Sequence, residues 1–158
     1  MKRPYPTPPT DAPAGTVSLG GPMGWFSASL HITAEDLIPA EVTRILLVEP
    51  TESQTNGVPI LRENGSIKRV PNFGRWSISL KPQHTDEWDL NVVIADLLDR
   101  LPKTLEIWRE VERRGSLHIS LGLTLAGSNQ EFRLESRLLH FLGERGISVY
   151  FDVYTEDT

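Results

Sequence analysis

The sequence predicts an α+β fold, a two-layer sandwich in which a mixed sheet of four or more strands carries helices on one face. Four segments alternate apolar and polar residues with a period of two, the pattern of strands with one buried face. Segments with the apolar spacing of amphipathic helices lie between them. Because each strand keeps one polar face, we expect helices to cover only the other side of the sheet.

The first strand is predicted over residues 25–32. Its apolar positions, two residues apart, are Phe26, Ala28, Leu30 and Ile32. A short helix is predicted to begin at Pro39, because proline suits the first turn of a helix. It is predicted to end before Pro50, because the residue that precedes a proline avoids helical backbone.

The Asn64-Gly65 pair predicts a β-hairpin, since this dipeptide fits the tightest hairpin turns. The two strands of the hairpin are predicted over residues 58–62 and 66–70, followed by an irregular loop to Gly74. The next alternating segment, residues 75–80, predicts a strand whose apolar side is formed by Trp76, Ile78 and Leu80.

A long helical region is predicted to begin near Leu90. Its apolar stripe consists of Leu90, Val93, Ile94, Leu97, Leu98 and Leu101, continued by Leu105, Trp108 and Val111. Pro102 cannot lie unkinked inside a helix, so it either kinks one helix or starts a second. Gly115 is expected to cap the C-terminal end.

Residues 117–125 give the clearest predicted strand, because five apolar residues alternate strictly with His118, Ser120, Gly122 and Thr124. A last helix is predicted around Leu134–Leu142 and is closed by Gly146. The final strand, residues 147–154, has Ile147, Val149, Phe151 and Val153 on one side. Leu121 and Phe151 are expected to be core residues of neighbouring or nearly neighbouring strands.

Two regions are predicted along the chain of 158 residues. Residues 1–24 are rich in proline and glycine and poor in large apolar side chains, so we expect a disordered tail. Residues 25–158 are predicted to form a single domain. The absence of cysteine excludes disulfides and thiolate metal sites.

Charge and hydropathy exclude two classes of partner. The formal net charge is -5 without a basic run, whereas nucleic-acid binders carry a basic footprint. No apolar run approaches the roughly 20 residues that span a bilayer, and no apolar region follows the first basic residues as in a secretory signal. The expected location is therefore the cytoplasm, with no nucleic-acid or membrane partner.

The polar face of the predicted sheet is the candidate site, because it gathers hydroxyl, imidazole and aromatic groups. The predicted binding residues are Trp25, His31, His118, Tyr150, Asp152 and Tyr154. A Ser-His-Asp arrangement or a metal site using His31, His118 and Asp152 could be drawn from this face, but both depend on geometry that a sequence does not fix. Serine and threonine are also ordinary residues for a solvated strand face. We therefore predict no catalytic residue, no metal and no cofactor.

Several segments of the chain resemble one bacterial family, known as domain of unknown function 4279. They are Phe26–Ile32, Val48–Thr51, Gly57, the strand around Trp76, Leu97–Leu101 and the closing Phe151–Tyr154. The resemblance covers Phe26 to Tyr154 and rests on structural motifs. It implies a small cytoplasmic bacterial protein and offers an immunity or antitoxin role, with no catalytic residues to transfer.

Three functions remain open from the sequence. The first is a non-enzymatic protein that binds another protein, in the form of an immunity-type partner that neutralises a toxin. The second is a small enzyme or ligand-binding domain that uses the serine- and histidine-bearing face. The third is a structural homo-oligomer built through that face or an edge strand. The first is preferred because the chain carries no catalytic motif.

Overall fold

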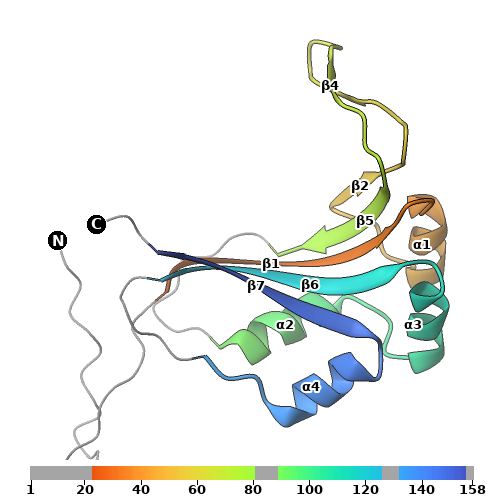
Figure 1. The fold of residues 1–158 in the computed structure, drawn as a ribbon. Coiled ribbons are helices and arrows are strands. Elements are labelled where there is room, and N and C mark those ends of the chain that lie inside the picture. The colour runs from red at the N-terminus through yellow and green to blue at the C-terminus, as the bar shows by residue number, and fades with distance from the viewer. Residues whose placement is uncertain (1–22, 81–88, 126–131, 156–158) are drawn as a thin grey trace, which may run out of the picture.

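The computed structural model describes residues 23–80, 89–125 and 132–155. A mixed sheet of five strands lies at its centre (Figure 1). The strands are β1 (Met23–Ala34), β2 (Glu52–Gln54), β5 (Gly74–Ser79), β6 (Ser116–Leu125) and β7 (Ile147–Thr155). Their order across the sheet is β2-β5-β1-β6-β7, and only the β6–β7 pair is parallel.

Four helices lie along one face of this sheet (Figure 1). They are α1 (Pro39–Leu46), α2 (Leu90–Asp99), α3 (Leu105–Glu112) and α4 (Ser136–Gly143). The predicted α+β sandwich, with helices on one side of a mixed sheet, is confirmed. None of the helices in the described ranges is both long and apolar enough to cross a membrane.

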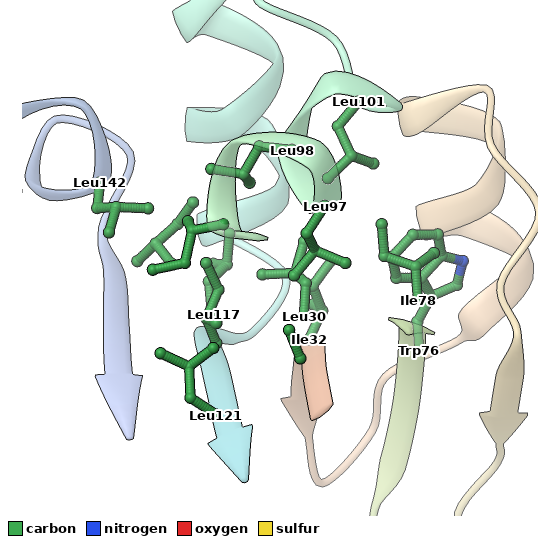
Figure 2. Packing of buried hydrophobic residues seen from close by; sticks show 14 of the residues in the cluster. Leu30, Ile32, Trp76, Ile78, Leu97, Leu98, Leu101, Leu117, Leu121 and Leu142 are labelled. Carbon is green, nitrogen blue, oxygen red and sulfur yellow. The ribbon is translucent and has the colours of Figure 1, made fainter. Parts of the chain in front are cut away.

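The core fills the layer between the sheet and the helices (Figure 2). Trp76 of β5 and Trp108 of α3 are its largest buried side chains. Each buried indole N–H finds an acceptor, as buried tryptophans require. Trp76 Nε1 donates to Thr43 Oγ1 at 3.0 Å, and Trp108 Nε1 donates to the Pro102 carbonyl at 2.8 Å. Pro102 lies in the connection between α2 and α3, so the predicted helical region consists of two helices.

The predicted hairpin is confirmed as β3 (Ile60–Leu61) and β4 (Ile67–Arg69). Gly65 has a positive φ of 79°, the left-handed backbone that its Asn-Gly turn requires. The hairpin projects away from the helices, on the side of the sheet formed by β2 and β5 (Figure 1). The edge strand β2 was not predicted, because its three residues, Glu-Ser-Gln, contain no apolar alternation.

The predicted role of Gly115 as a helix cap is wrong. Helix α3 is capped by Arg113 with right-handed backbone, and Gly115 is not among the residues with positive φ. A Cβ at Gly115 would instead lie 2.6 Å from the Thr33 carbonyl oxygen of β1. A glycine is therefore needed here for close backbone packing. Gly146, in contrast, follows the last helix with a φ of 64°.

The predicted burial of the last strand is wrong for its second half. Phe151 and Val153 are 39% and 46% exposed, whereas Ile147 is buried and Val149 packs against the core. Helix α4 covers only the beginning of β7 (Figure 1). Phe151 is nevertheless the Cα partner of the fully buried Leu121, as the predicted neighbouring strands require.

The tail predicted over residues 1–24 lies outside the described residues except for its last two positions. Strand β1 begins at Met23, so Met23 and Gly24 are part of the sheet.

Candidate functional site

The sheet face opposite the helices carries the candidate site, and no helix of the described ranges covers it (Figure 1). Strand pairing aligns its polar residues in rows across the sheet. One row runs from Ser77 of β5 through His31 of β1 and His118 of β6 to Ser148 of β7. The alternation of β1 and β6 places these residues on one face, and the pairing register brings the two histidines opposite each other.

Two histidines and a tyrosine form the centre of the face. The His31 and His118 rings have centroids 5.0 Å apart and are tilted by 35°. The Tyr150 ring meets His118 edge-to-face, at 5.0 Å and 87°. Because Tyr150 belongs to β7, this contact depends on the parallel pairing of β6 with β7. The structure thus joins three of the predicted site residues into one cluster.

Hydroxyl groups on β5 tie this cluster to the neighbouring strand. His31 Nδ1 and Ser77 Oγ share a hydrogen bond of 2.8 Å, and Ser29 Oγ donates to Ser79 Oγ at the same distance. Ser77 is only 2% exposed. The hydrogen bond to this buried hydroxyl therefore fixes the orientation of the His31 ring.

The surroundings of the two histidines favour the neutral imidazole. Burial is the largest cause and, with repulsion from His118 when it is protonated and from Arg75, lowers the pKa of His31 from 6.5 to about 4. Glu52 opposes this shift, although its carboxylate is 3.1 Å from Arg75 Nη2 in an ion pair. Burial also lowers the pKa of His118. Both rings are therefore uncharged at neutral pH.

Asp152 and Tyr154 form a second, separate pair on β7. The Tyr154 hydroxyl donates a hydrogen bond to Asp152 Oδ2, and this bond is the main cause that raises the pKa of Tyr154. Asp152 is the Cα partner of Gly122, whereas His118 pairs with Ser148, four residues earlier on β7. Four strand residues correspond to about 13 Å, so Asp152 does not reach the histidines.

This separation bears on the two chemical alternatives drawn from the sequence, because both of them need Asp152 beside the histidines. Asp152 joins neither a Ser-His-Asp arrangement nor a metal site with His31 and His118. Among the residues that the structure describes, no group of three or more metal-ligating side chains is placed to hold an ion. The face can therefore offer neutral hydrogen-bonding groups, aromatic rings, the Asp152 carboxylate and the ion pair of Arg75 with Glu52.

Trp25 is the remaining predicted site residue. Its backbone belongs to β1 and pairs with Thr124, which in turn pairs with Tyr154. The Trp25 side chain lies outside what the structure describes. The roles of Ser77 and Glu52 were not predicted from the sequence. The alternation of residues 75–80 places Ser77 on the open face of the sheet, but only the pairing of β5 with β1 and β2 shows its partners.

Comparisons with known proteins give one family match and one partial match. The subunit delta of ATP synthase from Psychromonas ingrahamii is 33% identical to this chain over 79 residues, which are 47% of the chain and 44% of that protein. The chain thus matches less than half of the length of this curated relative. No solved structure matches the chain significantly. The family model described as domain of unknown function (DUF4279) matches residues 25–156, nearly all of the chain after the proline-rich segment. The chain therefore belongs to this family.

Proposed function

We propose that this chain is a non-enzymatic, cytoplasmic bacterial protein that binds another protein through the open face of its sheet. The specific form that we propose is an immunity-type partner that neutralises a toxin. One observation carries the proposal: Tyr150 and Tyr154 are 60% and 50% exposed on the open face. Tyrosines in such positions dominate binding energy at many protein interfaces, since they combine a large apolar ring with a hydroxyl group.

The groups around the tyrosines support contacts with a polar partner. The neutral rings of His31 and His118 and the exposed hydroxyl of Ser148 in the same row can donate and accept hydrogen bonds without the cost of desolvating a charge. The carboxylate of Asp152 and the net charge of -5 favour a partner with a basic surface, because complementary charge steers association.

The alternative function is a small enzyme, and the observation that favours it is the hydrogen bond between His31 and Ser77. A serine nucleophile needs an accessible hydroxyl and a base with a pKa near the working pH. Ser77 is buried, and the pKa of His31 is about 4. These properties suit a structural hydrogen bond better than an acyl-transfer site, so they support the binding role.

The test begins with a tagged full-length chain that captures its partner from the native host, followed by titration with the purified partner. Tyr150→Ala and Tyr154→Ala are each expected to weaken binding about thirtyfold or more, since truncating an aromatic anchor costs roughly 2 kcal/mol or more. Leu139→Ala is the matched control. Leu139 is also half exposed but lies on α4, in the helical layer.

His31→Ala and His118→Ala separate the two functions. In a binding protein they weaken partner affinity and the cellular effect in parallel. Loss of the cellular effect from a histidine variant that still folds and still binds the partner with unchanged affinity would contradict the non-enzymatic role. Equal affinity of the Tyr150, Tyr154 and Leu139 variants would show that the open face is not the binding surface.

A further inference from the structure

Strand β7 forms a long outer edge of the sheet. It has nine residues and pairs on one side with β6, and no strand of the described ranges pairs with its other side. The opposite edge of the sheet ends in β2, which has only three residues and carries Glu52. Proteins usually shorten, charge or cover their edge strands, because unpaired N–H and C=O groups attract another strand. Within the part of the chain that the structure describes, the β7 edge has none of these protections except the single charge of Asp152.

On both faces of the sheet, side chains of β7 are partly exposed. On the helix-bearing face, Phe151 and Val153 extend beyond α4, and the Phe151 ring stacks on Phe132 at 5.2 Å and 22°. On the open face, Tyr150, Asp152 and Tyr154 are exposed. The edge therefore offers apolar surface on one side and hydrogen-bonding groups on the other.

We propose that β7 pairs antiparallel with β7 of a second copy of this chain, with Phe151 facing Phe151 across the two-fold axis. Phe151 is the middle residue of the nine in β7, so this register pairs all nine residues. Opposite residues of an antiparallel pair point to the same face of the sheet. The apolar face then joins two Phe151 rings and places Val149 against Val153, while the open face places Tyr150 against Asp152.

The neighbouring registers fit less well. A register centred on Asp152 would place two carboxylates directly opposite each other, and like charges in this position destabilise a sheet. A register centred on Tyr150 would pair only residues 147–153, seven of the nine, and would face Asp152 with Ser148. The register centred on Phe151 gives the longest ladder and lets each Asp152 accept a hydrogen bond from a tyrosine of the other copy.

The dimer would extend the candidate site. Two five-stranded sheets would continue across the axis, so each copy would contribute Tyr150 and Tyr154 to one shared open face. Only this consequence for binding rests on the proposed function. The mass of the free protein tests the dimer without any partner, so the two proposals can fail separately.

The first measurement is the molar mass of the full-length protein by light scattering during size-exclusion chromatography. We expect about 35 kDa, twice the 17.7 kDa of one chain. Phe151→Lys would bring two lysines together on the axis and is expected to give a mass of 17.7 kDa. Ile67→Lys, on the exposed β4 strand, is the matched control and is expected to remain dimeric.

An introduced disulfide tests the register of the strand pair. This test remains decisive even where Phe151→Lys fails to fold. The chain has no cysteine, so one introduced cysteine can form a disulfide only with a second copy. Under mild oxidation, Phe151→Cys is expected to give a covalent dimer, since the two sulfurs lie across the axis. Val153→Cys, which faces Val149 of the other copy, is expected to remain uncrosslinked. A wild-type mass of one chain, a dimeric Phe151→Lys variant or equal crosslinking of the two cysteine variants would each overturn the proposal.

Discussion

Replacing Leu121 with alanine is expected to lower the free energy of unfolding by about 2–5 kcal/mol, the usual range for a buried leucine. Leu121 lies in the middle of β6 and is fully buried between the sheet and the helices (Figure 2). The truncation removes apolar contacts and leaves a cavity that the surrounding side chains fill only partly. Urea denaturation followed by circular dichroism measures the loss as a shift of the midpoint at constant slope.

Two controls separate burial from position in the sheet. Phe151→Ala changes the Cα partner of Leu121 on β7, where the side chain is partly exposed, so its loss should be smaller. His118→Ala changes the same strand as Leu121 on its open face and should also have a small effect. All three variants are compared at a protein concentration low enough to keep the chain monomeric, because Phe151 also lies on the axis of the proposed dimer and dimerisation adds to stability. A loss for His118→Ala equal to that for Leu121→Ala would contradict the assignment of the two faces of β6.

The strict alternation of β6 explains why most of the fold could be predicted from the sequence. Every second residue from Leu117 to Leu123 is buried, as the period of two requires. The same rule failed at Phe151 and Val153. Alternation assigns side chains to a face but does not say how far a covering helix extends along it. Helix α4 covers β7 only as far as Val149, and no local pattern in the sequence of β7 indicates where α4 lies.

The candidate site was predictable as a face but not as a cluster. His31 and His118 belong to the polar positions of alternating strands, so the sequence places both on one side of the sheet. Their contact depends on strand order and register, which arise from long-range pairing and not from local propensity. The parallel pairing of β7 then brings Tyr150 to His118 and leaves Asp152 four residues away, a division that the sequence alone did not reveal.

The largest expected effect of pH comes from His31. The pKa of His31 is about 4 in the folded protein, and the ordinary value of the unfolded chain is 6.5. Between these values the unfolded chain binds more protons than the folded one, so stability falls as the pH falls. The contribution is fully present above pH 6.5 and is lost progressively as the pH approaches 4. His118 acts in the same direction, because burial lowers its pKa as well.

We expect the wild-type protein to lose roughly 1 kcal/mol more stability than His31→Gln when the pH is lowered from 7 to 5, after allowance for the partial exposure of the ring. Glutamine keeps a hydrogen-bonding group near Ser77 but has no proton to gain. Urea unfolding of both proteins at the two pH values gives the difference, and carboxylates that titrate in both proteins cancel in it. Parallel pH profiles would show that His31 titrates in the folded state as it does in the unfolded chain. A steeper wild-type profile would show that the fold holds this imidazole neutral, as the proposed binding face requires of its histidines.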